Sequence, residues 1–279
     1  MNRREEQLVS VITPVFNMAD SVSACIESVR RQPYGRWEQI VVDDGSEDDT
    51  WQRLNECALA ESRLRILRQE HGGMAKARNA ALARANGTLI ALLDADDLAM
   101  SERLSAPIAH LADHPEIDVL GGGHGEFTVG GRVLGGRTPV TDHETLVKDM
   151  WRRTPFFVST VTARRRFFEE TGGFNESRWF RRSEDIDLWF RGAHRFRYGN
   201  LTAPLAWYRR KERLSMRDAL YSCHARLRAM LRANKPHLFW YALRPLLAVI
   251  AGAAGLYSRK PYAPLSETFP SDLIGKRKP

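Results

Sequence analysis

Three carboxylates within four positions close an apolar run in the first third of the chain. The run covers residues 89–93 (LIALL), and Asp94, Asp96 and Asp97 follow it. A buried strand cannot carry this much negative charge unless a positive group neutralises it. Because alternate residues of an extended backbone share a face, we expect Asp94 and Asp96 to point into one pocket. Carboxylate oxygens suit Mg²⁺ or Mn²⁺, so the stretch predicts either a metal site or a solvated acidic turn.

Two more carboxylates follow a second apolar run. Asp43 and Asp44 come directly after residues 37–42 and precede a Gly-Ser pair. They fit a type I turn in which an aspartate caps the next helix. The other interpretation is that they accept hydrogen bonds from a base or a ribose. Since the carboxyl ends of parallel strands share one edge of a sheet, both acidic groups are predicted to form one acidic rim.

Small residues and two cations open a helical stretch at residues 71–78 (HGGMAKAR). Backbone N–H groups near Gly73, together with Lys76 or Arg78, are suited to contact phosphates. The alternative is an exposed basic helix face. The stretch matches neither of the glycine-rich phosphate motifs, GxxxxGK[ST] and GxGxxG.

A third acidic pair, Glu184 and Asp185, follows Ser183. Ser183 can cap a helix, and acidic residues in a first helical turn are favoured by the helix dipole without any further function. A carboxylate that faces a pocket from a helix start can also act as a general base.

Strands and helices alternate through the first hundred residues and must position these groups. This order predicts a parallel sheet with helices on both faces, an α/β fold. After Asp97, which is expected to cap the next helix, the alternation becomes irregular, with a hairpin at 126–134, a strand at 157–162 and a long basic helix at 215–233. The expected strands of the first part are 8–16, 37–42, 64–67 and 89–94. The expected helices are 20–31, 49–61 and 74–86, the last of them capped by Gly87.

The charge of the chain indicates a polyanionic partner. The 279 residues carry a net charge of +8 with a pI near 9.7, and the basic residues thicken after Trp151. Nucleic acid, anionic lipid or a phosphorylated substrate would fit this charge. Three cysteines without motif spacing favour a reducing compartment, and the polar start of the chain is no signal peptide. We expect a cytoplasmic protein, with or without peripheral attachment to the cytoplasmic face of a membrane.

Taken together, these stretches resemble the family 2 glycosyltransferases of the GT-A fold. The resemblance covers residues 8–208 and follows the order and spacing of the family. The matching segments are VITPVFN at 11–17, VVDDGSEDDT at 41–50, ARNAALARANG at 77–87, LLDADD at 92–97, GGFNE at 172–176 and EDIDLW at 184–189.

The resemblance implies transfer of a sugar from a nucleotide donor, often a UDP-sugar, with inversion at the anomeric carbon and with Mg²⁺ or Mn²⁺ as cofactor. It implies that Asp96 binds the metal beside Asp94, which meets the ribose, and that Asp185 is the general base with Glu184 beside it. The implied nucleotide contacts are Pro14 and Phe16 for the base, Asp20 after the first strand, Asp43 for uracil, Asp44 for the nucleoside, and Gly73, Lys76 and Arg78 for the base or diphosphate.

The resemblance also divides the chain. Residues 1–212 would form the GT-A domain, with a nucleotide-binding half at 1–98 and an acceptor-binding half at 99–212. A helical extension would follow at 213–260, and a loose basic tail at 261–279. Arginines and aromatic residues in the second half fit a glycan, lipid-linked or polysaccharide-precursor acceptor.

Residues 238–257 form an apolar stretch that is long enough to span a bilayer, but Arg244 and Pro245 interrupt it. The three interpretations are a helix lying on a membrane surface, a helix packed on protein and a spanning helix.

Two other functions compete with sugar transfer. They are metal-dependent nucleotidyl transfer and nucleic-acid binding, although no nucleic-acid-binding motif is present and no nucleic acid is expected as a partner.

Overall fold

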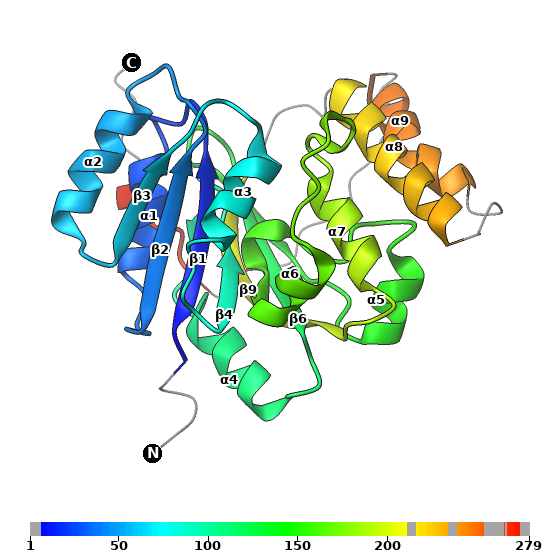
Figure 1. Ribbon diagram of the computed structural model, residues 1–279, viewed down its shortest axis with the longest axis horizontal. Coiled ribbons are helices and arrows are strands. Elements are labelled where there is room, and N and C mark those ends of the chain that lie inside the picture. The colour runs from blue at the N-terminus through cyan, green and yellow to red at the C-terminus, as the bar shows by residue number, and fades with distance from the viewer. Residues whose placement is uncertain (1–6, 211–215, 234–238, 254–264, 266, 274–279) are drawn as a thin grey trace.

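Parallel strands at the start of the chain deliver the acidic motifs to one edge of a sheet (Figure 1). The computed structural model describes residues 7–210, 216–233, 239–253, 265 and 267–273. The first strands lie in the order β3-β2-β1-β4 and all run parallel, as the sequence predicted. Their bounds are β1 (Val9–Val15), β2 (Trp37–Asp43), β3 (Leu64–Arg68) and β4 (Leu89–Leu92). The connecting helices are α1 (Val22–Arg30), α2 (Thr50–Ala60) and α3 (Met74–Leu82).

Helix α3 ends at Leu82, four residues earlier than the sequence predicted, and Gly87 is not its cap. The backbone N–H of Asn86 donates to Glu38 Oε1 over 2.6 Å, which draws the chain towards β2. A Cβ on Gly87 would lie only 2.6 Å from the carbonyl oxygen of Leu8, so this glycine permits the close approach to β1.

Mixed strand pairing characterises the second half of the chain. The sheet continues from β4 in the order β8-β6-β9-β5, and β7 pairs with β6 at the side. Strand β8 runs antiparallel to β4, whereas β6 and β9 are parallel. The strands are β5 (Leu98–Ala99), β6 (Val119–Phe127), β7 (Val133–Arg137), β8 (Thr162–Arg164) and β9 (Tyr198–Arg209). The helices are α4 (Ser105–Asp113), α5 (His143–Asp149), α6 (Arg165–Thr171) and α7 (Glu184–Gly192).

The predicted strand at 157–162 is instead a single 3-10 turn, η1 (Val158–Thr160), followed by β8. Local side-chain bonds explain the difference, because hydroxyl groups compete with a strand ladder for backbone partners. The Thr160 hydroxyl donates to the carbonyl of Phe157 over 2.7 Å, and the Ser159 hydroxyl donates to Asp97.

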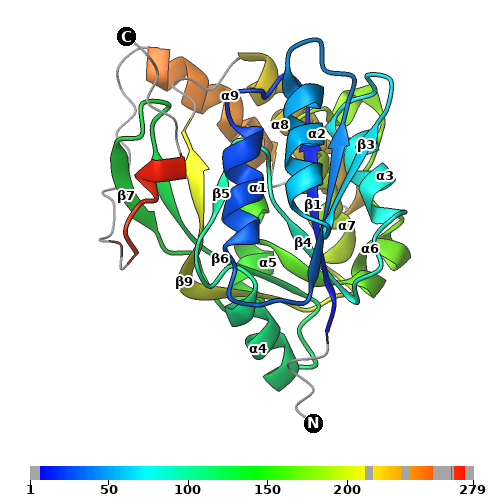
Figure 2. The ribbon, with the colours of Figure 1, turned by 90° about the vertical axis from the view of Figure 1, so that its left-hand side faces the viewer.

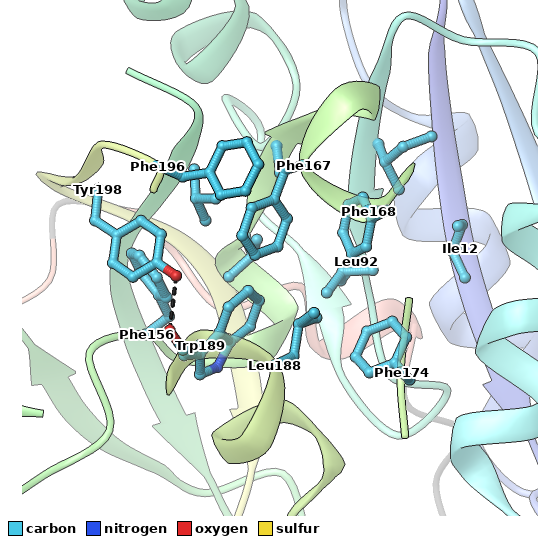
Figure 3. Close-up of a cluster of buried hydrophobic side chains, with 14 of the residues drawn as sticks. Ile12, Leu92, Phe156, Phe167, Phe168, Phe174, Leu188, Trp189, Phe196 and Tyr198 are labelled. Carbon is cyan, nitrogen blue, oxygen red and sulfur yellow. Dashed lines mark hydrogen bonds between the residues drawn. The ribbon is translucent and has the colours of Figure 1, made fainter. Parts of the chain in front are cut away.

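An aromatic cluster fixes α7 against the sheet (Figure 3). Trp189 on α7 is fully buried, and its ring lies 5.1 Å from that of Phe156 and 5.9 Å from that of Phe167. The hydroxyl of Tyr198 donates to the Trp189 carbonyl over 2.7 Å, so a strand residue holds the helix directly. This packing positions the start of α7, where Glu184 and Asp185 lie.

Two C-terminal helices, α8 (Met216–Arg232) and α9 (Phe239–Ala253), lie side by side at the end of the molecule opposite α2 (Figure 1). They confirm the predicted helical extension. Helix α8 is anchored by buried Arg226, which donates to the carbonyls of Met150 and Trp151 over 3.0 and 2.8 Å. Among the described helices, none has the length and apolar character needed to cross a membrane.

Of the tail that the sequence predicted to be loose, the structure describes Leu265 and residues 267–273, and residues 267–273 lie beside β7 and α1 in Figure 2. Leu265 and Phe269 pack against a buried group that includes Trp207, and the rings of Phe269 and Trp207 are 5.1 Å apart. Asp272 pairs with Arg31 over 2.7 Å. The apolar residues among the prolines and charges explain why this segment is held on the domain.

Candidate active site

A cavity of about 570 Å³ lies at the carboxyl ends of β1, β2 and β4. This is where ligands bind in open α/β sheets. Pro14 lines it from β1, and the other lining residues at this edge follow directly after the strands: Phe16 after β1, Asp44 after β2, and Asp94 and Asp96 after β4. The opposite wall comes from the loop before α7, from Glu184, and from the first turns of α8. The structure therefore brings the acidic rim and the Glu184 motif to one cavity.

Asp44 organises the turn that precedes α3. Its two oxygens accept the backbone N–H groups of Gly72 and Gly73 over 2.9 and 2.7 Å, and Gln69 donates to it over 2.6 Å. Gly73 has a φ of +95°, a conformation that glycine adopts without steric cost. Neighbouring Asp43 is fully buried and accepts the backbone N–H of Ser46 over 3.0 Å, with Arg68 beside it at 3.2 Å. Asp44 thus lines the cavity, while Asp43 supports the turn behind it.

Two rings form one end of the cavity. The rings of Phe16 and His71 have centroids 4.3 Å apart and are tilted by 36°. His71 also lies 3.0 Å from an Asp44 oxygen. An aromatic face beside fixed polar groups can hold a planar ring by stacking and hydrogen bonding.

The acidic end of β4 gathers three carboxylates. One oxygen from each of Asp94, Asp96 and Asp97 lies within 4.8 Å of the others. Such a set of hard oxygen donors fits a divalent cation such as Mg²⁺ or Mn²⁺. The buried Cys25 thiol lies nearby, but burial and the three carboxylates raise its pKa, so the thiol stays protonated and is no competing ligand.

Asp97 is a support for this site and not the helix cap that the sequence indicated, since α4 begins only at Ser105. Asp97 is buried and accepts the Ser159 hydroxyl and the backbone N–H of Arg209, the latter over 2.9 Å. Burial, followed by the charges of Asp96 and Asp94, raises its pKa well above the ordinary value. Asp94 and Asp96 are therefore the carboxylates that face the cavity.

Buried Arg103 holds the backbone behind these carboxylates. Its guanidinium donates to the carbonyls of Leu92 and Ser159 over 2.9 and 2.8 Å, and to that of Val161 over 2.6 Å. No carboxylate accompanies it among these contacts, and burial lowers its pKa to about 9. The end of β4 and the η1 turn are thus tied together by one side chain.

Arg78 connects the acidic end of β4 with the start of α7. It is buried and donates to Asp94 over 2.7 Å and to Glu184 over 2.6 Å. Burial lowers its pKa, but the charges of Asp94 and Glu184 outweigh burial and raise the pKa above the ordinary value. Arg78 stays charged and lies behind the cavity wall, so its direct partners are carboxylates of this chain.

Asp185 follows Glu184 in the first turn of α7 and is partly exposed. Burial and the Glu184 charge raise its pKa to about 6, while the nearby Arg78 charge acts in the opposite direction. A carboxylate with such a pKa is ionised at neutral pH and is still basic enough to accept a proton.

The remaining sequence-predicted residues lie away from the cavity wall. Asp20 and Lys76 are exposed, and neither lines the cavity. The Lys76 side chain lies over Gly72, where an added Cβ would be 2.4 Å from the lysine Cδ. Asp185 is also absent from the cavity wall, so Glu184 alone of the acidic pair lines it.

Several cavity residues were not found from the sequence. His71 had a visible signal, because it precedes the Gly-Gly turn, but nothing indicated stacking on Phe16. Arg217 and Tyr221 reach the cavity from α8, which the sequence placed outside the domain. Only tertiary packing brings this helix to the site.

With this geometry established, comparison with known proteins decides the family. The family described as Glycosyl transferase family 2 matches residues 10–187, more than half of the chain. The chain belongs to this family. EpsE of Bacillus subtilis (strain 168) is 32% identical over 257 residues, which cover 88% of this chain and 90% of EpsE.

A second relative shares a shorter segment. WfgD of Escherichia coli, named a UDP-Glc:alpha-D-GlcNAc-diphosphoundecaprenol beta-1,3-glucosyltransferase, is 41% identical over 106 residues. This segment covers 38% of this chain and 41% of WfgD.

Solved structures share the fold. S. aureus TarS, residues 1–349, has a TM-score of 0.64 with 22% identity, covering 88% of this chain and 73% of that one. The mannosyltransferase PcManGT from Pyrobaculum calidifontis, in complex with GDP-Man and Mn²⁺, has a TM-score of 0.62 with 21% identity, covering 90% and 76% of the two chains. The protein is a glycosyltransferase with the GT-A fold, which favours sugar transfer over the nucleotidyltransferase and nucleic-acid-binding alternatives.

Proposed function

We propose that the protein transfers a sugar from a UDP-sugar, with inversion and with Mg²⁺ or Mn²⁺, to a hydroxyl of a glycan, lipid-linked or polysaccharide-precursor acceptor. The Arg78 bridge supports this proposal most strongly. Arg78 joins Asp94 of the acidic rim to Glu184 of the α7 motif. Arg78 and Glu184 lie 106 positions apart in the sequence. A donor cavity and a candidate base are thereby held in one fixed arrangement.

The nucleotide would occupy the end of the cavity near Phe16 and His71. Stacking on these rings and the rigid Asp44 turn suit a base and its ribose. The neighbours support a nucleotide-sugar, since TarS has been solved with UDP and with UDP-GlcNAc. We therefore retain the five sequence-predicted nucleotide contacts that line the cavity, namely Pro14, Phe16, Asp44, Gly73 and Asp94.

A divalent cation would be held by Asp96 together with Asp94. When bound, it supplies Lewis-acid stabilisation of the diphosphate as negative charge builds on the leaving group. Arg78 keeps Asp94 ionised and oriented through its 2.7 Å hydrogen bond. Buried Asp97 holds the backbone beneath both carboxylates through Ser159 and Arg209.

Asp185 would remove the proton from the acceptor hydroxyl. It is partly exposed outside the wall of the donor cavity, which suits a base that must meet a second substrate. Its raised pKa of about 6 lies close to neutral pH, where a general base is most effective. Glu184 would hold the start of α7 in place through Arg78.

We also propose that α9 lies on the cytoplasmic surface of a membrane. Phe239, Trp240, Leu247 and Ile250 are exposed on this helix, with Trp240 at 71%. Large apolar side chains with flanking arginines suit the interface of an anionic bilayer.

A vesicle flotation assay tests this proposal. A variant that carries both Trp240→Glu and Leu247→Glu should bind the vesicles less than wild type. Leu59→Glu on α2, where Leu59 is 91% exposed, is the control that should bind as wild type. Equal binding by all three proteins would contradict the membrane proposal.

The proposed reaction is tested by offering UDP-sugars with Mn²⁺ and polyprenyl-diphosphate-linked sugar acceptors. The expected result is release of UDP and a glycoside of inverted anomeric configuration. Release of pyrophosphate, or a retained configuration, would contradict the proposal.

A further inference from the structure

A second cavity of about 410 Å³ adjoins the donor cavity. Its lining residues form what we term the basic patch, which consists of Arg178, Trp179, Arg181, Arg217 and Tyr221. Arg181, Arg217 and Tyr221 also line the donor cavity, so the two spaces share a wall. The patch comes from the loop before α7 and from α8, and no strand of the sheet contributes to it.

The arginines of the basic patch have no acidic partner among the described residues. In the part of the chain that the structure describes, Arg178, Arg181 and Arg217 form no ion pair. The neighbouring Arg182 differs, because both of its contacts go to Asp218, at 2.8 Å each. Three positive charges at one cavity mouth without carboxylates favour an anionic ligand.

Aromatic rings support two of these guanidinium groups. Arg178 lies 4.9 Å from the centre of the Trp179 ring, and Arg217 lies 5.9 Å from that of Tyr221. The Trp179 ring rests in turn against His224 of α8, with centroids 5.8 Å apart. When an aromatic ring contacts the flat face of a guanidinium group, the N–H groups at its edge remain available. Two of these N–H groups can then bind phosphate oxygens in bidentate fashion.

Apolar side chains flank the patch on α8. Met216 and Leu220 are 47% and 54% exposed and stand next to Arg217 and Tyr221 in sequence. Residues three and four apart share a helix face, so Leu220 and Arg217 lie on the same side of α8. A ligand with a phosphate group and a hydrocarbon chain would meet complementary groups at both positions.

We infer that the basic patch binds the diphosphate of a lipid-linked sugar acceptor, with the lipid chain on the exposed apolar side chains of α8. This inference rests on the proposed transfer reaction and specifies its acceptor. In the proposed reaction the donor diphosphate binds at the acidic end of β4. The basic patch therefore stays available for the second substrate when the donor is bound. The shared wall allows the acceptor sugar to extend from the patch towards Glu184, which lines the donor cavity and precedes Asp185 in α7.

The test measures binding of farnesyl diphosphate, a short polyprenyl diphosphate, to the full chain saturated with UDP and Mn²⁺. Arg178→Ala and Arg217→Ala should each weaken this binding about tenfold, as loss of one charge-assisted phosphate contact predicts. In Arg178→Ala the affinity for UDP should stay within about twofold, because Arg178 lines the second cavity and does not line the donor cavity. Arg36→Ala is the control, because Arg36 is exposed just before β2, away from both cavities, and its loss should change neither affinity.

Each other outcome overturns the inference. An equal loss of UDP affinity and of farnesyl diphosphate affinity in Arg178→Ala would assign this arginine to the donor diphosphate. If farnesol bound as tightly as farnesyl diphosphate, the diphosphate would contribute nothing to binding. If inorganic pyrophosphate bound as tightly as farnesyl diphosphate, the lipid chain would contribute nothing to binding. Wild-type UDP binding without any farnesyl diphosphate binding would reject the acceptor site while leaving the proposed sugar transfer intact.

Discussion

Arg78 donates a hydrogen bond of 2.7 Å to Asp94 from beneath the acidic end of β4. The other nitrogen of the same guanidinium reaches Glu184, so one buried cation neutralises charge on both sides of the cavity. The second oxygen of Glu184 is buried without a hydrogen-bond partner in the described part of the chain. Without Arg78, the two carboxylates would repel each other across the site.

Replacing Arg78 should therefore destabilise the fold as well as the site. Arg78→Met would leave buried Glu184 uncompensated, and we expect the free energy of unfolding to fall by about 3–5 kcal/mol. Urea denaturation measures the loss. Arg53→Met is the matched control, because its pair with Glu56 is exposed and should contribute less than about 1 kcal/mol. Equal losses in the two variants would show that the Arg78 bridge has no special structural weight.

Metal dependence should follow Asp96. In Asp96→Asn, we expect the gain in UDP affinity on adding Mn²⁺ to shrink at least tenfold, because a ligand carboxylate has been neutralised. Isothermal titration with and without Mn²⁺ measures the gain. Glu56→Gln, on exposed α2, should behave as wild type. A full Mn²⁺ response in Asp96→Asn would place the cation elsewhere.

Activity should depend on the ionisation of Asp185. Its folded-state pKa is raised to about 6, so the carboxyl group is protonated below this pH and cannot accept a proton. We expect kcat/KM to fall tenfold per pH unit below about 6 and to level off above it. The matching stability effect has the opposite sign, since a raised carboxyl pKa favours the folded state at low pH and this contribution is lost as pH rises through 6. A rate that is flat from pH 5 to 8 would contradict the role of Asp185.

The parallel half of the sheet and most of its rim could be predicted because local patterns determine them. Apolar runs that end in Asp43 and Asp94 define strand ends, and parallel pairing then places those ends on one edge. Glu184 of the third acidic pair lines the same cavity. These features depend on residues that are close in sequence or on a simple topological rule.

The remaining features depend on partners that lie far apart in the chain. Asp97 is a buried support only because Ser159 and Arg209 reach it from 62 and 112 positions away. Arg103 ties β4 to the η1 turn because it also reaches Ser159, which lies 56 positions away. Periodicity carries no information on such contacts, and it could not show that α8 would supply Arg217 and Tyr221 to the cavity.

We propose that Asp185 performs the proton transfer and that other residues bind the donor. The most direct measurement compares Asp185→Asn with wild type in both sugar transfer and Mn²⁺-dependent UDP binding. The account predicts a loss of about 10²–10⁴-fold in kcat, with the dissociation constant for UDP unchanged within about twofold. Transfer at the wild-type rate, or a loss of UDP affinity as large as the loss of transfer, would contradict it.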